Sequence, residues 1–224
     1  MSSTRSLRLT ALALCFGASA LALAADNKIT PTLESVQVQH NGQTVTIQRG
    51  HDLNATLPDA FQKTDRGCPP FCVQPMTVVE GVETIGELEV LNYLHRMSQG
   101  DKDILLVDSR TPDWVMRGTI PGSVNIPWNR ISRDNAGTFE TPREADTFEQ
   151  TLRDDFNVIR DPASGALDFS KAKTLVLFCN GIWCPQSTAN IKTLVGIGYP
   201  LHKLKWYRGG MQDWLSVGLT SVQP

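Results

Sequence analysis

The chain has 224 residues and a formal net charge of −2, with 41% hydrophobic and 20% charged residues. This composition excludes a largely disordered chain, and the length allows one domain with a core plus additional segments. The slightly acidic balance argues against nucleic acid or an anionic membrane surface as a partner.

Residues 1–24 are expected to form a secretory signal peptide. Arg5 and Arg8 precede an apolar stretch at residues 9–23, and residues 22–24 (Ala-Leu-Ala) form a small-residue cleavage pattern. The stretch is short for a membrane span, and an uncleaved anchor is the alternative. Cleavage would remove two arginines and Cys15, changing the formal charge from −2 to −4. We therefore expect a periplasmic or secreted protein without a membrane span after cleavage.

Residues 25–75 form a predicted N-terminal extension. Apolar and polar residues alternate at 36–39 and at 45–48 around Asn41-Gly42, which predicts a β-hairpin. A hairpin alone is only marginally stable in water, so we expect it to pack on the main domain. Residues 53–65 show no clear period and are interpreted as a linker. The segment 67–72, Gly-Cys-Pro-Pro-Phe-Cys, should be rigid because each proline fixes its own φ angle.

The main domain is expected at residues 76–224. Thr84 and Glu87 form a predicted capping box that opens a helix with Leu88, Leu91 and Leu94 on one face. Residues 104–107 are a predicted buried strand that ends at Asp108.

The second half of this domain continues the alternation of strands and helices. A second capping box at 141–144 should open a helix with Phe148, Leu152 and Phe156 on one face. Strands are predicted at 174–178 and 203–207, and helices at 185–195 and 211–217, the last ending at Gly218. This order indicates an α/β fold with a mostly parallel sheet covered on both faces.

Cys179 follows the apolar strand at 174–178, and a loop separates it from a helix that should begin at Pro185. The cysteine therefore stands at the carboxyl end of a strand and faces the N-terminus of a helix. Backbone N–H groups and the positive end of the helix dipole favour a thiolate there. The thiolate is the reactive form of sulfur, so the sequence predicts nucleophilic cysteine chemistry, without a cofactor or metal.

Three segments resemble the signatures of the rhodanese family. The first comprises Leu-Leu-Val-Asp-Ser-Arg at 105–110 and Gly-Thr-Ile-Pro-Gly-Ser-Val-Asn-Ile-Pro at 118–127. The second is the loop after Cys179. The third comprises Tyr-Arg-Gly-Gly-Met-Gln-Asp-Trp at 207–214 and Gly-Leu-Thr at 218–220. The resemblance covers about 77–222. It implies a five-stranded, mostly parallel sheet flanked by helices. It also implies that Cys179 carries sulfane sulfur as a persulfide, taken from a small sulfur donor and passed to a thiol or cyanide.

The loop departs from the family pattern. Its sixth position is a second cysteine, Cys184, and residues 180–186 contain neither Arg nor Lys. Phosphatase and arsenate-reductase loops use an Arg to hold an oxyanion, so those activities are disfavoured and thiosulfate as donor is uncertain. Substrate would instead rely on backbone N–H groups of Asn180, Gly181, Ile182 and Trp183.

Three further side chains were assigned roles near this loop. Arg110 is the nearest plausible cation for an anionic substrate. The Trp183 side chain is expected to form a pocket wall or to contact a partner. Asp108 is expected to support the sheet edge through hydrogen bonds to backbone N–H groups or to Arg110.

The four cysteines outside the signal segment leave several pairings open. Cys184 is expected either to attack a persulfide or sulfenate on Cys179, forming a disulfide, or to poise the Cys179 thiolate; a static bridge is the alternative. Cys68 and Cys72 are expected to form a structural disulfide, and a redox relay with the loop cysteines is the alternative. Four cysteines allow three connectivities. A zinc site is less favoured because the spacings differ from the usual two-residue knuckle.

The sequence as a whole predicts an exported single-domain sulfurtransferase with an N-terminal hairpin extension. The alternative is a periplasmic thiol–disulfide oxidoreductase or redox sensor that uses Cys179 and Cys184, with Cys68 and Cys72, and a redox partner protein. A third hypothesis is a binding module that only docks a partner, and the presence of the loop cysteine counts against it.

Overall fold

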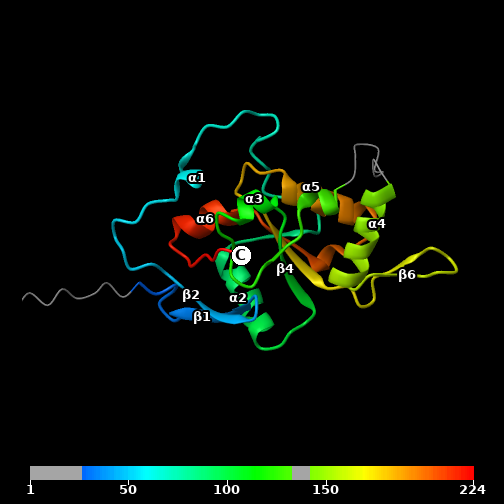
Figure 1. Ribbon diagram of the computed structural model, residues 1–224, viewed down its shortest axis with the longest axis horizontal. Helices are drawn as coiled ribbons and strands as arrows, with labels where there is room; N and C mark the ends of the chain where they lie inside the picture. Colours follow the sequence, from blue (N-terminus) through cyan, green and yellow to red (C-terminus); the bar gives the residue numbers. More distant parts are fainter. Residues whose placement is uncertain (1–26, 133–141) are drawn as a thin grey trace, which may run out of the picture.

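The computed structural model describes residues 27–132 and 142–224 (Figure 1). The predicted signal peptide at residues 1–24 and Thr141 of the second predicted capping box lie outside the described residues. The strands are β1 (Ser35–His40), β2 (Gln43–Gln48), β3 (Glu83–Ile85), β4 (Ile104–Asp108), β5 (Val124–Asn125), β6 (Ile159–Arg160), β7 (Leu167–Asp168), β8 (Thr174–Phe178) and β9 (Leu204–Tyr207). The α-helices are α1 (Asp59–Gln62), α2 (Glu87–Ser98), α3 (Pro112–Val115), α4 (Pro142–Gln150), α5 (Gln186–Gly196) and α6 (Gly210–Ser216). Shorter turns are η1 (Trp128–Arg130), the π-helical η2 (Thr151–Asp155) and η3 (Leu201–Lys203).

The central sheet has five strands in the order β3-β9-β8-β4-β5, and every neighbouring pair is parallel. This confirms the predicted fold class. The inner strands β8 and β4 are continuous apolar runs because helices cover both of their faces.

Alternate residues of β8 face two separate cores. Val176 and Phe178 pack with α2, α6 and the N-terminal hairpin. Leu175 and Leu177 pack on the other face with α4, η2 and α5. The three residues predicted to line the helix after 141 are all buried in this second core: Phe148, Leu152 and Phe156.

The N-terminal hairpin packs against the main domain, as predicted. Asn41 and Gly42 both have positive φ angles, 49° and 78°, which fits the tight turn between β1 and β2. Val36, Val38 and Ile47 are buried beside α2 in the first core. The hairpin therefore covers an apolar helix face that would otherwise meet water.

The predicted start of α2 was wrong by two residues. Thr84 lies in strand β3, and the helix is capped at Gly86, whose N–H donates a hydrogen bond of 2.9 Å to the Glu89 carboxylate. Leu88 is exposed, and Val90 joins the core instead. Pairing of β3 with β9 keeps Thr84 in extended conformation, so local sequence preference gives way to the sheet.

The segment interpreted as a linker contains a short helix, α1, that serves as an anchor. Its Phe61 is 1% exposed and packs against Trp114, with 5.9 Å between the ring centroids. The extension therefore continues over the main domain beyond the hairpin, along the edge where α3 and α6 also lie (Figure 1). A single buried aromatic produces no periodic pattern, which is why the sequence did not predict this contact.

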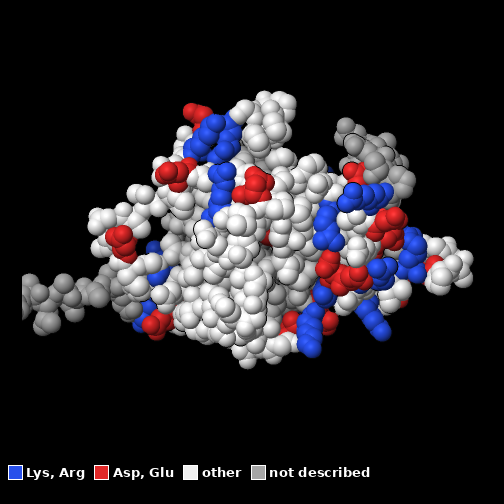
Figure 2. All heavy atoms as spheres, viewed as in Figure 1, with Lys and Arg blue, Asp and Glu red and all other residues white. Residues whose placement is uncertain are grey.

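Charged side chains are unevenly placed on the face shown in Figure 2. Lys, Arg, Asp and Glu gather over the N-terminal extension and around α4, and an uncharged area separates the two groups. Within the described parts of the chain, we find no helix with both the length and the apolar character needed to cross a bilayer.

Candidate active site

The candidate site lies where the parallel strands end. Asp108 closes β4, Phe178 closes β8 and Tyr207 closes β9, and these three residues pair laterally in the sheet. Because parallel strands share one carboxyl edge, the loops that follow them meet there. Cys179 is the first residue of the middle loop.

The backbone of this middle loop is held by its neighbours. The N–H groups of Met211 and Gln212, in the first turn of α6, donate to the carbonyls of Cys179 (3.0 Å) and Asn180 (2.9 Å). First-turn N–H groups of a helix have no partner inside the helix, so they are free to bind the loop. From the N-terminal extension, the Gln74 N–H donates to the Ile182 carbonyl at 2.8 Å.

Gly210 makes this close approach possible. Its φ is +57°, and a Cβ built there would lie 2.3 Å from the carbonyl oxygen of Cys179 and 2.9 Å from the Gly181 nitrogen. No other residue fits without moving the loop. The Gly-Gly pair in the third predicted signature therefore has a steric reason.

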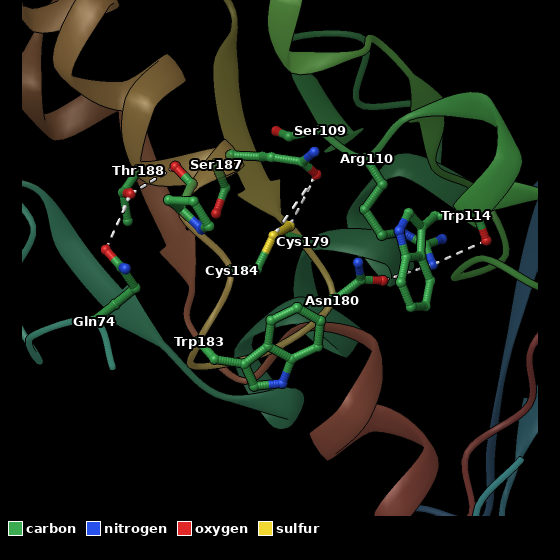
Figure 3. The surroundings of a disulfide bond; sticks show 12 residues. Gln74, Ser109, Arg110, Trp114, Cys179, Asn180, Trp183, Cys184, Ser187 and Thr188 are labelled. Atoms are coloured by element: carbon green, nitrogen blue, oxygen red, sulfur yellow. Dashed lines mark hydrogen bonds between the residues drawn. A yellow bond between two sulfur atoms is a disulfide. The ribbon is translucent and has the colours of Figure 1, made fainter. Parts of the chain in front are cut away.

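A disulfide joins Cys179 to Cys184 across the loop, with 6.1 Å between their Cα atoms (Figure 3). Cys179 is 2% exposed and Cys184 is 3% exposed. A second disulfide joins Cys68 to Cys72 in the extension. Of the three connectivities the sequence allowed, the structure holds the one with two local bridges.

The Cys179 sulfur stands at the N-terminus of α5. Oε1 of Gln186, the first residue of that helix, lies 3.3 Å from Cys179 Sγ and 3.7 Å from Cys184 Sγ. Pro185 precedes the helix instead of opening it, which shifts the predicted start by one residue. In the disulfide neither sulfur is a nucleophile, and reduction would create a thiol where the helix dipole favours its ionised form.

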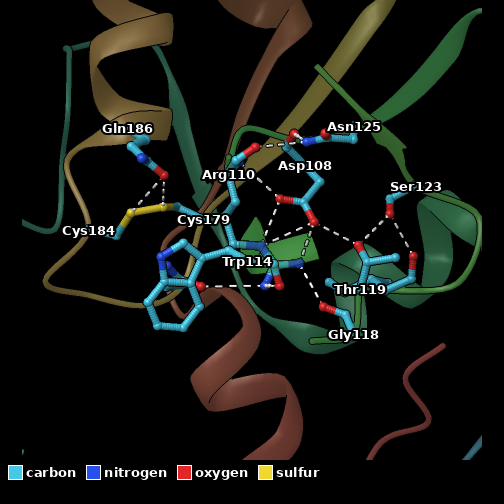
Figure 4. A network of polar contacts seen from close by, with 12 residues as sticks. Asp108, Arg110, Trp114, Gly118, Thr119, Ser123, Asn125, Cys179, Cys184 and Gln186 are labelled. Carbon is cyan, nitrogen blue, oxygen red and sulfur yellow. Dashed lines mark hydrogen bonds and ion pairs between the residues drawn. A yellow bond between two sulfur atoms is a disulfide. The ribbon is translucent and has the colours of Figure 1, made fainter. Parts of the chain in front are cut away.

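A buried ion pair lies beneath the loop (Figure 4). The carboxylate of Asp108 accepts hydrogen bonds from Arg110 Nε (2.8 Å), from the Arg110 backbone N–H (3.1 Å) and from Thr119 Oγ1 (2.7 Å). The two charged side chains are 0% exposed. Asp108 is therefore bound by Arg110 and Thr119 at the end of β4.

The substrate-binding role predicted for Arg110 does not fit this geometry. Its remaining N–H groups donate to the carbonyls of Gly118 (2.8 Å) and Trp114 (3.3 Å) and to Asn180 Oδ1 (3.4 Å). A fully buried guanidinium with all these partners cannot reach a ligand in solvent. Arg110 instead links Asp108 to the active-site loop, and it fixes the Asn180 side chain.

The four predicted loop residues have different surroundings. Asn180 and Gly181 are buried, and Ile182 is half-buried and packs against the disulfide. Trp183 is 8% exposed, and its Nε1 donates to Gln212 Oε1 at 2.8 Å. The indole is thereby fixed beside Cys184.

An aromatic cavity of about 350 Å³ opens beside the disulfide. Three tryptophans from three different segments line it: Trp114, Trp128 and Trp183. Pro70 and Phe71 of the extension form another part of the wall, and Cys184 is also a lining residue. The cavity has the size of a small-molecule site.

The Cys68–Cys72 segment shapes one side of this cavity. Phe71 lies between the two bonded cysteines and meets Trp183 edge to face, with ring centroids 5.7 Å apart. The disulfide shortens the segment and limits where Phe71 can lie. The extension is therefore part of the candidate site.

A cation from the extension also reaches this region. The guanidinium carbon of Arg66 lies 3.6 Å from the ring centroid of Trp183. Burial lowers the pKa of Arg66, and its Nε and Nη2 atoms are buried without a hydrogen-bond partner. Stacking on an indole face offsets part of this cost.

Sequence reasoning missed five of these residues: Arg66, Phe71, Trp114, Trp128 and Gln186. Four of them come from segments distant in sequence, so no local pattern joins them to the loop. Phe71 had the one usable signal, because it lies between two cysteines in a rigid segment. Among the described residues, no group of three His, Cys, Asp or Glu side chains is arranged to hold a metal ion.

Comparisons with known proteins agree with the predicted resemblance. The Rhodanese-like domain family model matches residues 90–217, more than half of the chain. No curated protein matches the sequence.

Solved structures similar to this chain include two sulfurtransferases. The human single-domain sulfurtransferase is 19% identical over 60% of this chain and 96% of that chain, with a TM-score of 0.34. The polysulfide-sulfur transferase homodimer from Wolinella succinogenes is 22% identical over 65% and 81%, with a TM-score of 0.37. A Rhodopseudomonas palustris protein described as a possible tyrosine phosphatase is 22% identical over 75% and 100%, with a TM-score of 0.39.

Proposed function

The chain belongs to the rhodanese-like domain family, and from this premise we propose that it is a sulfurtransferase that carries sulfane sulfur as a persulfide on Cys179. Family membership supports the general class of reaction. The observation that carries the specific proposal is the position of Cys179 Sγ, after a buried strand and against the first residue of α5. A thiolate is favoured there, and a thiolate is what attacks sulfane sulfur.

The proposed cycle begins with the reduced loop. The Cys179 thiolate attacks the outer sulfur of a donor persulfide R–S–SH, forms Cys179–S–SH and expels the thiolate R–S⁻. Transfer to cyanide then returns the Cys179 thiolate and releases thiocyanate. A thiol acceptor would take the outer sulfur in the same way.

Cys184 gives the cycle a second exit. Its thiolate would attack the inner sulfur of Cys179–S–SH, form the Cys179–Cys184 disulfide and expel HS⁻. The bond between the two cysteines in the structure supports this step, because it places both sulfurs within bonding reach. An external thiol would then be required to reopen the loop.

A second candidate function is thiol–disulfide exchange. It is favoured by the two disulfides, one in the loop and one in the segment that holds Phe71 against Trp183. In this scheme a substrate dithiol is oxidised while the Cys179–Cys184 disulfide is reduced, and Cys68 and Cys72 relay electrons to a redox partner protein. We further propose an exported location, where disulfides persist.

Cyanolysis separates these functions. The reduced protein is loaded with a sulfane sulfur donor, desalted and treated with cyanide, and thiocyanate is measured. We expect about one equivalent from Cys184→Ser, less from the wild type because Cys184 releases part of the sulfur as HS⁻, and none from Cys179→Ala. An unchanged yield from Cys179→Ala would refute the sulfurtransferase assignment to this residue. Absence of thiocyanate from Cys184→Ser, together with rapid reduction of the wild-type disulfide by dithiols, would favour exchange.

A further inference from the structure

The two cysteines of the loop disulfide are almost equally buried, at 2% exposed for Cys179 and 3% for Cys184, but only Cys184 borders the aromatic cavity. Cys184 is one of the residues that line the cavity, and Cys179 is not. Thiol–disulfide exchange requires in-line approach of a thiolate to one sulfur, so access decides which sulfur is attacked. An incoming thiol that occupies the cavity meets Cys184 first.

The other sulfur, on Cys179, is the nearer of the two to the first residue of α5: Gln186 Oε1 lies 3.3 Å from it and 3.7 Å from Cys184 Sγ. Cys179 Sγ stands at the N-terminus of α5, within 3.3 Å of the Gln186 side chain. The helix dipole stabilises negative charge at this end. A stabilised thiolate leaves faster in disulfide exchange. Access and electrostatics therefore favour the same direction of bond breaking.

The cavity lining indicates what kind of thiol would enter. No charged side chain lines it, and the Arg66 guanidinium stacks on the Trp183 ring without being one of the lining residues. Of its two amide side chains, Asn180 accepts a hydrogen bond from Arg110. Phe71 and Trp128 at its wall are 42% and 36% exposed, which leaves apolar surface for a ligand to cover. Aromatic walls of this kind favour a flat or branched apolar body over an inorganic anion.

We propose that the cavity binds the apolar body of a small organic thiol, which opens the Cys179–Cys184 disulfide by attack on Cys184. The ligand thiolate bonds to Cys184 Sγ, the Cys179–Cys184 bond breaks, and its electron pair leaves with Cys179 as a thiolate. A second thiolate of the same ligand class then attacks the ligand sulfur of the mixed disulfide. This releases Cys184 as a thiolate and the ligand as its disulfide. The inference rests on the proposed function only in that the released Cys179 is the sulfur carrier.

The first test locates the attacked sulfur. The purified protein, with its disulfides intact, is mixed with phenylmethanethiol or with 2-mercaptoethanesulfonate, quenched in acid, alkylated at low pH and mapped by mass spectrometry. We expect the ligand on Cys184 and the alkyl group on Cys179. For each thiol, the rate of reaction with the protein is divided by its rate with cystine, which corrects for the intrinsic reactivity of the thiol. This normalised rate should be at least about tenfold higher for phenylmethanethiol than for 2-mercaptoethanesulfonate. A ligand found on Cys179, or equal normalised rates, would overturn the proposal.

A second test avoids re-closure of the loop. In Cys179→Ser, Cys184 is left as a single loop thiol and is labelled with benzyl methanethiosulfonate or with its anionic sulfonatoethyl analogue. Phe71→Ala and Trp128→Ala in this background should each reduce the preference for the benzyl reagent several-fold. Ile159→Ala, an exposed apolar residue outside the cavity lining, is the matched control and should leave it unchanged. Equal labelling by both reagents, or a preference insensitive to Phe71 and Trp128, would contradict an aromatic binding site.

The two proposals can fail separately. Cyanolysis uses protein reduced beforehand and does not require the cavity. Thiocyanate release together with attack on Cys179 would leave the sulfurtransferase intact and remove the cavity proposal. Attack on Cys184 without any thiocyanate would do the reverse.

Discussion

The Gln186 side chain lies near both loop sulfurs, and it carries no charge. Its Oε1 lies 3.3 Å from Cys179 Sγ and 3.7 Å from Cys184 Sγ. A neutral amide can turn its NH₂ group toward a thiolate after reduction, whereas a carboxylate would repel it.

Gln186→Glu should therefore disfavour the Cys179 thiolate. A carboxylate at this distance should raise the pKa of the Cys179 thiol by about one unit. We therefore expect alkylation of the reduced protein by iodoacetamide to slow about tenfold near neutral pH. The measurement is the rate against pH in a Cys184→Ser background, so that one loop thiol reacts. Gln186→Met, of similar size, is the uncharged control. Faster alkylation of the Glu variant would show that the amide does not face the sulfur.

Removing one partner of the buried Asp108–Arg110 pair should strongly destabilise the fold, because the other charge would stay buried without a partner. Asp108→Ala leaves the Arg110 guanidinium buried and unpaired, which should lower the free energy of unfolding by about 3–5 kcal/mol. Glu83→Ala, which breaks the exposed Glu83–Lys205 pair, should cost less than about 1 kcal/mol. Urea unfolding of the three proteins measures both changes. Similar costs for the two variants would mean that the buried network is not the support described above.

For single residues, the sequence predicted which side chains belong to the site better than it predicted the contacts that those side chains make. Cys179 and Asp108 were placed at strand ends by the apolar runs before them. Arg110 was misjudged because the sequence shows its charge but not the loop that closes over it. Trp114 and Phe71 reach the cavity only through packing between distant segments.

The contact between α6 and the active-site loop depends on Gly210. In Gly210→Ala the new Cβ would lie 2.3 Å from the Cys179 carbonyl, in a backbone conformation with positive φ. We expect a loss of about 1–3 kcal/mol of stability and a much larger relative loss of sulfur transfer, because the loop must move. Thermal unfolding and the cyanolysis assay measure the two effects.

Gly196 provides a matched control for this substitution. It is in α5, and a Cβ built there meets nothing within 4 Å. Gly196→Ala should leave activity unchanged and raise stability by up to about 1 kcal/mol, because alanine favours the helix. Equal losses from the two alanine variants would mean that the close approach of α6 to the loop is unimportant.

Elements were predicted well where apolar periodicity was strong, as in β4, β8 and α5. The start of α2 was predicted at the wrong residues because Thr84 has a good capping sequence but pairs with Trp206 in the sheet. Helix α1 was missed because only Phe61 among its four residues is buried. Short elements held by one long-range contact leave little trace in the local sequence.

A titratable side chain, His40, makes one of the contacts between the N-terminal hairpin and the main domain. His40, at the end of β1, accepts a hydrogen bond at Nδ1 from the Gly122 N–H, at 3.1 Å. Burial lowers the pKa of His40 below 6.5. Protonation would also remove the lone pair that accepts this bond, so the folded state binds this proton less readily than the unfolded chain.

Stability should consequently fall as the pH drops below about 6.5, and the His40 contribution should level off once the pH is below the folded-state pKa. Above that range both states are neutral at His40, and the contribution is constant. Urea unfolding at several pH values between about 5 and 8 measures the slope. His40→Gln should flatten it. An unchanged slope in the variant would assign the pH dependence to other groups.

At the scale of the molecule, strand and helix order was sufficient to predict the α/β fold and the docked hairpin. The path of residues 53–76 over the active site was not predictable, because it depends on contacts such as Phe71 with Trp183 and Phe61 with Trp114. The extension thereby joins the family's fold to form a cavity that the loop alone does not contain.

The central claim is that one sulfur, on Cys179, carries the transferred atom. The most direct measurement is peptide mapping by mass spectrometry of reduced protein loaded with a sulfane sulfur donor and alkylated without further reduction. We predict an added mass of about 32 Da on the peptide that contains Cys179, lost on treatment with cyanide and retained longest in Cys184→Ser, where the loop cannot close with release of HS⁻. Stable addition only at Cys184, Cys68 or Cys72, or the same loading in Cys179→Ala, would contradict it.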